Sequence, residues 1–292
     1  MTHDTKNSFA FFGTPDVAVK TLDILFTHGF VPTIIITSPD RPSGRGLTLT
    51  PPPVKVWAQE HAIPCLQPEI IDSEFIATLQ SYNFNLSIVV AYGKILPQEL
   101  IDLPEKGTLN IHYSLLPRYR GASPVESAIL NGDTETGVTI QQMVFKLDAG
   151  NIIAQESTPI GNDETTPELR DRLIVIGGEL LANVLPSVWN GVATNTVQDE
   201  TLVTRSRKMT KESGLIDLSD DSKTNYNKYR AYKLWPRTYF FSEKNGLPTG
   251  QAGKQTRVVI TKASLVNNVF TPLLVIPEGK KEIKYEDFLR NN

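Results

Sequence analysis

The chain has 292 residues, of which 40% are hydrophobic and 21% are charged, a composition typical of a globular protein long enough for two domains. These proportions exclude a disordered or collagen-like chain, and the single cysteine, Cys65, excludes an internal disulfide and indicates a reducing, cytoplasmic compartment. The net charge of −3 divides into −10 for residues 1–205 and +7 for residues 206–292, which indicates either a polyanionic partner such as nucleic acid or a solvated lysine-rich surface.

Short apolar runs alternate with helix-like segments over the first 160 residues. Strands are predicted at 8–12, 31–37, 86–91 and 108–114. Helices are predicted after the turn Gly13-Thr14-Pro15, from near Val54 and from near Ala122, with a loop at 38–53. Runs that are apolar on both faces and alternate with helices are typical of a parallel sheet covered on both sides, so we predict an α/β fold. The first turn has one glycine where a dinucleotide fingerprint needs three, so no nucleotide cofactor is expected.

The second half begins with two more predicted strands and a long helix, and then changes character. The strands are predicted at 138–144 and 152–160, and the helix at 166–189. The apolar part of that helix is shorter than the ~20 residues of a membrane span, and residues 1–8 are polar, so neither a span nor a secretory signal is expected. Short strands at 235–241, 257–261 and 273–276 and a helix near 222–232 follow. We therefore predict a first domain at 8–190, a linker at 191–206 and a mainly β domain at 207–292.

The strand Thr108-Leu109-Asn110-Ile111-His112 carries two polar side chains in an apolar run. Side chains alternate across a strand, so Asn110 and His112 point to one face. Such groups are costly to bury without partners, and ligands bind at the carboxyl ends of strands in open α/β sheets. An amide can donate to a developing oxyanion, and an imidazole can exchange a proton near neutral pH. Asp148, in a loop between two strands, can orient that imidazole; a purely structural Asn/His pair and a turn aspartate are the alternative.

These residues resemble a known family. The run Asn110–Pro117 followed by Arg120-Gly121-Ala122-Ser123-Pro124 is similar to the signature of the folate-dependent formyltransferases, and Asp148 matches an aspartate of that family. The segments that resemble the branch acting on methionyl-tRNA are Phe12–Asp16, Ser38–Gly46, Pro52–Lys55 and Gln198-Asp199-Glu200. The resemblance covers residues 9–242 and recurs at 277–289.

The resemblance implies a fold and an activity. It implies a Rossmann-like formyltransferase domain followed by a smaller OB-like C-terminal domain that binds tRNA. It implies that 10-formyltetrahydrofolate, a co-substrate, delivers its formyl group to the α-amine of methionyl-initiator tRNA, in a monomer that needs no metal and no membrane. The implied catalytic residues are Asn110, His112 and Asp148. The implied folate-binding segments are 89–97 and 114–117, with Tyr92, Ile95, Ser114, Leu115, Leu116 and Pro117 as the contacts. The implied tRNA-binding residues are Arg41 and Arg45.

Two departures from the family pattern predict local differences. Tyr113 stands where the family has a smaller residue, so crowding of the folate loop is expected. The C-terminal module shows no strand signal between Leu265 and Thr271, which predicts a shortened barrel. The alternative activities are an amino-sugar formyltransferase, a hydrolase that releases formate from formyl-folate, and an RNA-binding protein without catalysis.

Overall fold

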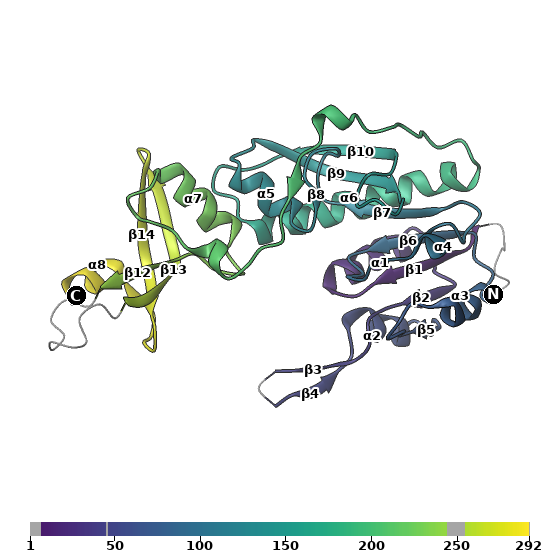
Figure 1. Ribbon diagram of the computed structural model, residues 1–292, viewed down its shortest axis with the longest axis horizontal. Coiled ribbons are helices and arrows are strands. Elements are labelled where there is room, and N and C mark those ends of the chain that lie inside the picture. The colour runs from purple at the N-terminus through teal and green to yellow at the C-terminus, as the bar shows by residue number, and fades with distance from the viewer. Residues whose placement is uncertain (1–6, 45, 244–254, 292) are drawn as a thin grey trace. The chain divides into compact units, whose positions relative to one another are not determined.

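The computed structural model describes residues 7–44, 46–243 and 255–291, and the chain divides into two compact units (Figure 1). The first unit contains Met1–Arg120, Gly137–Ser157 and Asp171–Arg205. The second contains Gly121–Thr136, Thr158–Arg170 and Ser206–Asn292. Each unit is therefore built from separated pieces of the chain, and the predicted division into domains at 8–190 and 207–292, with a linker at 191–206, stays a prediction.

A seven-stranded sheet in the order β10-β9-β7-β6-β1-β2-β5 forms the centre of the first unit. Its strands are β1 (Phe9–Gly13), β2 (Ile34–Ile36), β5 (Cys65–Leu66), β6 (Leu86–Val90), β7 (Thr108–His112), β9 (Glu135–Gln142) and β10 (Ile152–Pro159). The strands from β5 to β7 are parallel, as predicted, but β9 runs antiparallel to β7. The sheet is therefore mostly parallel, with an antiparallel edge at β9, because the chain re-enters the sheet beside the end where β7 leaves it, with His112 opposite Thr139.

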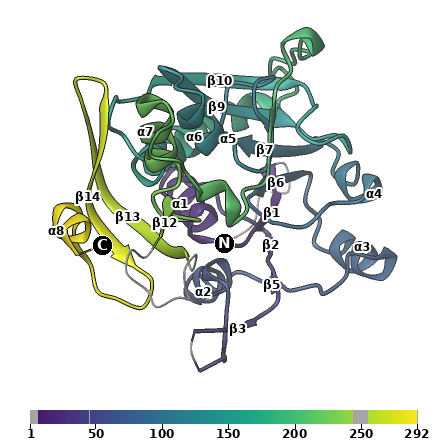
Figure 2. The same cartoon turned by 60° about the vertical axis from the view of Figure 1, so that its left-hand side comes forward.

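Both faces of this sheet are covered, because both sets of alternating side chains are apolar. Ala10, Phe12 and Val89 face α3 (Ser73–Gln80) and α4 (Gln98–Ile101) in one core cluster. On the other face Phe9 contacts Trp189, the last residue of α6 (Thr166–Trp189), and α1 (Asp16–Thr27) lies beside this helix (Figure 2). The remaining helices of the first half are α2 (Pro53–Glu60) and α5 (Pro124–Leu130).

Helix α6 packs closely on the sheet because it carries Gly177 and Gly178. A Cβ on Gly177 would lie 3.0 Å from the Ile111 side chain of β7, and one on Gly178 would press on Ile24 of α1. Within the described residues α6 is long and apolar enough to cross a membrane, but half of its most apolar window is buried in the protein. That burial is typical of a core helix.

The predicted loop at 38–53 contains a β-hairpin, so that prediction is wrong in part. Strand β3 (Arg41–Ser43) pairs antiparallel with β4 (Thr48–Thr50), and the hairpin projects from its unit in both views (Figure 1, Figure 2). Gly44 adopts a φ of 72°, which favours glycine and permits the reversal.

The second unit holds a four-stranded sheet in the order β12-β13-β14-β15. Its strands are β12 (Tyr239–Glu243), β13 (Gln255–Val266), β14 (Val269–Pro277) and β15 (Ile283–Lys284), accompanied by α7 (Ser222–Ala231) and α8 (Tyr285–Arg290). The smaller β8 (Arg120–Gly121) and β11 (Arg205–Ser206) pair with each other, and short 3-10 turns lie at Glu200–Leu202 and Glu212–Gly214.

The small β domain is confirmed, but the missing strand signal was misleading. Strand β13 continues to Val266 and strand β14 begins at Val269. The two residues between them, Asn267 and Asn268, have φ values of 50° and 61°. Asparagine tolerates this left-handed conformation, so two residues suffice to turn the chain and both strands run through the expected gap.

Candidate active site

The carboxyl end of β7 carries the predicted catalytic strand residues. Asn110 lies opposite Gln141, and His112 opposite Thr139, on the antiparallel neighbour β9. Directly opposed residues point to the same face, so four polar side chains gather where the sheet is otherwise apolar. They lie on the face of α3 and α4, because Asn110 is in register with Val89, a member of that core.

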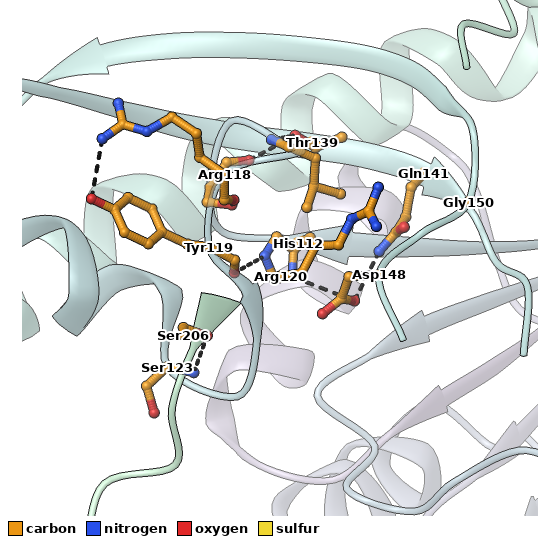
Figure 3. A network of polar contacts seen from close by, with 12 residues as sticks. His112, Arg118, Tyr119, Arg120, Ser123, Thr139, Gln141, Asp148, Gly150 and Ser206 are labelled. Carbon is orange, nitrogen blue, oxygen red and sulfur yellow. Dashed lines mark hydrogen bonds and ion pairs between the residues drawn. The ribbon is translucent and has the colours of Figure 1, made fainter. Parts of the chain in front are cut away.

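His112 is 5% exposed and is held between two oxygens (Figure 3). Its Nε2 lies 3.0 Å from the carbonyl oxygen of Tyr119, and its Nδ1 lies 3.6 Å from Oδ1 of Asp148. A carbonyl oxygen only accepts, so Nε2 carries the proton and Nδ1 is the nitrogen that gains or loses one. Burial lowers the pKa of His112, and the Asp148 charge and the Tyr119 hydrogen bond oppose this without cancelling it. The imidazole is therefore neutral at neutral pH.

Asp148 occupies the loop between β9 and β10 with a φ of 49°. Gln141 Nε2 donates to its Oδ1 at 3.0 Å, as Figure 3 shows. Gln198 Nε2 donates to the carbonyl oxygens of Asp148 at 2.9 Å and of Gly150 at 2.6 Å. A Cβ at position 150 would collide with the carbonyl of Gln142, so the loop closes tightly only with glycine there.

Asn110 is half-buried, and none of the hydrogen bonds that tie these neighbours together uses its amide. A cavity of about 330 Å³ has a mostly apolar wall, and its lining includes Asp148 and Gln141, the residue opposite Asn110, but neither Asn110 nor His112. The other lining residues are Lys94, Ile95, Leu96, Ile101, Met143, Val144, Phe145 and Leu147. The arrangement offers an amide donor, a neutral imidazole with a carboxylate, and an apolar compartment.

Comparison with known proteins identifies the family of the chain. Residues 7–185 match the model of the formyl transferase family. A methionyl-tRNA formyltransferase of Lysinibacillus sphaericus is 41% identical over 97% of this chain and 95% of its own, and one of Geobacter metallireducens is 38% identical over 97% and 94%. The chain belongs to the methionyl-tRNA formyltransferase family.

Solved structures agree in fold. The N-formyltransferase of Helicobacter canadensis, in complex with folinic acid and dTDP-3-aminofucose, has a TM-score of 0.65 at 18% identity, covering 94% of this chain and 98% of that one. HypX of Aquifex aeolicus, in complex with tetrahydrofolic acid, has a TM-score of 0.61 at 15% identity, covering 96% and 46%. At these identities the likeness concerns the fold alone.

The six residues expected to bind folate in a methionyl-tRNA formyltransferase lie in different surroundings. Ile95 is 85% exposed at the cavity described above, whereas Tyr92 is buried against Phe12, and burial raises the pKa of its hydroxyl to about 12. The segment Ser114, Leu115, Leu116 and Pro117 is not part of that lining; it forms the turn after β7. Ser114 Oγ donates to the Arg118 carbonyl at 2.6 Å, and Leu116 N donates to Thr139 Oγ1 at 3.1 Å.

The unusual Tyr113 does not enter this turn. Strand alternation carries its ring to the other face of β7, where its Cε1 would lie 3.5 Å from a Cβ on Gly177 of α6. The space left by a glycine accommodates the larger side chain. Whether this ring crowds the folate loop stays a prediction.

The two arginines expected to contact tRNA lie in the hairpin region. Arg41, on β3, is exposed, and its Nη2 lies 2.9 Å from Oε2 of Glu69. Arg45 lies outside the described residues. Both remain predictions.

Several residues that hold the site together are not among the catalytic or binding residues predicted from the sequence. Gln141 and Thr139 alternate on β9 as Asn110 and His112 do on β7, and this alternation is the sequence signal that points to them. Gln198 had been singled out only by resemblance; its Oε1 accepts from Arg120 Nε at 3.0 Å and Nη2 at 2.8 Å. Among the described residues no group of three His, Cys, Asp or Glu side chains forms a metal-binding cluster.

Proposed function

We propose that Asn110, His112 and Asp148 are the catalytic residues of this formyltransferase. The enzyme transfers the formyl group of 10-formyltetrahydrofolate to the α-amine of methionyl-initiator tRNA, for translation initiation. The observation that supports these roles is the geometry: His112 Nδ1 is turned to Asp148, Asp148 lines the apolar cavity, and the half-buried Asn110 lies on the same face of β7 as His112.

The cavity suits the aromatic part of a folate. Its wall is mainly apolar, with Leu96, Ile101 and Met143 in the lining, while Gln141 and Asp148 supply polar groups. A flat heteroaromatic ring gains from burial against such a wall and still needs a few fixed hydrogen-bond partners. Ile95 and the other contacts named for the folate are proposed to complete this site; Tyr92 supports it from the core.

The reaction forms a bond between the amine nitrogen of methionine and the formyl carbon, and breaks the bond from that carbon to the folate nitrogen. The carbonyl oxygen becomes negative as the carbon becomes tetrahedral, and the Asn110 amide donates a hydrogen bond to it. His112 Nδ1 accepts the proton that the attacking amine must lose. The proton finally goes to the folate nitrogen, so the imidazole is regenerated in its neutral form.

Asp148 supports the proton step electrostatically. A protonated His112 would be an ion buried at 5% exposure, and the carboxylate 3.6 Å from Nδ1 lowers the cost of that charge. The Tyr119 carbonyl keeps the other nitrogen protonated throughout. His112 therefore acts as a base in the forward direction.

Recognition of the tRNA is proposed for the Arg41–Arg45 hairpin and the basic C-terminal module, in a monomeric cytoplasmic enzyme. Residues 206–292 carry a net charge of +7, and neutralising phosphates releases counterions. The hairpin projects from its unit, which suits contact with a large substrate.

The assay that tests this function measures tetrahydrofolate release with formyl-folate and charged initiator tRNA. Release should require the tRNA and should match the formylated methionyl-tRNA formed. Release without tRNA would indicate a hydrolase, and release with an amino-sugar nucleotide in its place would indicate the other transferase branch.

Arg45→Ala should weaken the use of tRNA and leave folate binding unchanged. The expected result is a higher KM for charged tRNA, because one phosphate-directed charge is removed. The measurement is steady-state kinetics in both substrates, with Lys20→Ala, an exposed lysine paired with Asp171, as the control. A fall in folate affinity that matches the weaker use of tRNA would assign the hairpin a structural role.

The basic module should make tRNA binding sensitive to salt. Truncation after Ser206 is a poor test, because α7 packs on α5 within the second unit, so charge variants of the full chain are preferable. Replacing the exposed Arg207, Lys208 and Lys211 with alanine should reduce the slope of log affinity against log salt by roughly 0.7–0.9 for each phosphate that the variant no longer neutralises. An unchanged slope would reject this segment of the module as a phosphate-binding surface.

A further inference from the structure

The two residues that contact the His112 ring share an unfavourable backbone conformation. Tyr119, whose carbonyl oxygen lies 3.0 Å from His112 Nε2, has a φ of 60°, and Asp148, whose Oδ1 lies 3.6 Å from His112 Nδ1, has a φ of 49° (Figure 3). Residues other than glycine rarely adopt this left-handed conformation, and they keep it only where neighbouring contacts enforce it. The contacts that hold these two backbones therefore also set the surroundings of the imidazole.

Residues 198–204, which lie in the stretch expected to be a linker, hold the turn that carries Tyr119. Thr204 Oγ1 accepts from the main-chain N–H of Tyr119 at 2.8 Å. The main chain of Thr204 donates to the Pro117 carbonyl at 3.3 Å and accepts from the Arg120 N–H at 3.0 Å. The direction of the Tyr119 carbonyl, and with it the hydrogen bond to the imidazole, is therefore set in part by this segment.

The same segment holds the main chain of the Asp148 loop through Gln198. The Nε2 of Gln198 donates to the carbonyl oxygens of Asp148 and Gly150, and its Oε1 accepts from Nε and Nη2 of Arg120. Both hydrogens and both lone pairs of this buried amide are therefore in use. Arg120 is itself 3% exposed, and its Nη2 lies 3.0 Å from Oε1 of Glu200, so the turn and the loop are joined through a buried, charge-paired side chain.

We propose that residues 198–204 are a positioning clamp for catalysis, in which Gln198 and Thr204 hold the main chains of the two residues that contact His112. The inference rests on the proposed function, since it requires His112 and Asp148 to be catalytic. All the residues of the clamp and of its two targets belong to the first unit.

The clamp acts together with other contacts, and it lies outside the apolar cavity. Tyr119 and Asp148 are also contacted by other residues, such as Gln141 at the Asp148 carboxylate, so losing one contact of the clamp should slow the reaction without abolishing it. Neither Gln198 nor Thr204 is among the residues that line the described cavity. A defect in the clamp should therefore appear in kcat and not in the binding of folate.

Thr204→Val removes the hydroxyl acceptor and keeps the branched shape of the side chain. Single-turnover formyl transfer should slow roughly 5- to 10-fold, the effect of one lost hydrogen bond, while the KM for formyl-folate changes little. Thr204→Ser keeps the hydroxyl and should retain nearly full activity. The matched control is Thr201→Val, the same change in the same segment, where the hydroxyl donates to Asp199 Oδ1. Thermal unfolding checks that each variant is folded.

Gln198→Glu tests the other half of the clamp without loosening Arg120. The carboxylate still accepts from the guanidinium, but it has no N–H group for the carbonyls of Asp148 and Gly150. The rate of formyl transfer should therefore fall at least about 5-fold in a folded protein, again with little change in the KM for formyl-folate. Gln80→Met, at an exposed position at the end of α3, is the control for a change of a glutamine. If Thr204→Val does not fold, this variant decides.

Asp148→Asn distinguishes failure of this inference from failure of the proposed function. If Asp148→Asn is impaired while folded Thr204→Val and Gln198→Glu turn over like wild type, the clamp is overturned and the catalytic assignment stands. If Asp148→Asn and His112→Ala are both unimpaired, the catalytic assignment fails and the clamp fails with it. A defect in Thr204→Val that appears as a higher KM for formyl-folate at unchanged kcat, or that Thr204→Ser shares in full, would also overturn the inference, because the segment would then serve folate binding or folding.

Discussion

His112→Ala is expected to lower kcat by roughly 10²–10⁴, the range for loss of a general base. In the proposed mechanism Nδ1 of His112 is the proton acceptor, and no other group in the described site combines an imidazole nitrogen with a carboxylate partner. Single-turnover formylation of charged initiator tRNA at saturating formyl-folate measures the chemical step.

The control for this variant is His28→Ala. His28 is exposed, and its Nε2 lies 2.8 Å from Oε2 of Glu179, so its removal should leave turnover unchanged. Folding of both proteins is checked by thermal unfolding. Wild-type turnover in folded His112→Ala would remove the histidine from the mechanism.

Asn110→Ala should reduce kcat by roughly 10²–10³, as the loss of one oxyanion donor does in other enzymes. Asn110 lies at the carboxyl end of β7, opposite Gln141, and its half-buried side chain takes no part in the hydrogen bonds around His112 and Asp148. The amide is therefore available to the substrate.

Asn110→Asp separates donation from packing. It keeps the shape of the side chain and replaces the NH₂ donor with an acceptor, so it should be at least as slow as the alanine variant. Rapid-quench measurement of formyl transfer compares the two. Activity close to wild type in Asn110→Asp would show that shape, and not hydrogen-bond donation, is what the reaction requires.

Local sequence patterns predicted the parts of the fold that depend on local preference. The apolar periodicity of α6 gave its bounds of Thr166–Trp189, and alternation on β7 placed Asn110 and His112 on one face. The direction of β9 was not predictable, because alternation is the same for parallel and antiparallel neighbours. The Asn267-Asn268 turn was missed because two polar residues between apolar runs resemble a loop as much as a hairpin.

The residue types of the site were predictable from the sequence, but the contacts that orient these residues were not. The types and spacing of Asn110, His112 and Asp148 suggested the chemistry, and the resemblance to the family gave their roles. The contacts that orient them join distant positions: Gln198 holds the Asp148 loop from 50 residues away, and the Tyr119 carbonyl fixes the imidazole tautomer. Backbone acceptors have no sequence signal, since every residue carries one.

The pH profile of kcat/KM, compared between wild type and Asp148→Asn, tests most directly the claim that neutral His112, supported by Asp148, is the base. Activity should rise with pH through a pKa below the ordinary histidine value of 6.5, because burial lowers the pKa of His112 and the protonated form is inactive. The Asp148 charge opposes that lowering of the pKa. In Asp148→Asn the rise in activity that reports deprotonation of His112 should therefore occur at still lower pH, and the maximal rate should be reduced. Titration of the substrate amine is common to both enzymes, so the displacement between their profiles reports the enzyme group. If activity rises at the same pH in both enzymes, or at higher pH in Asp148→Asn, the proposal that His112 is a base supported by Asp148 is contradicted.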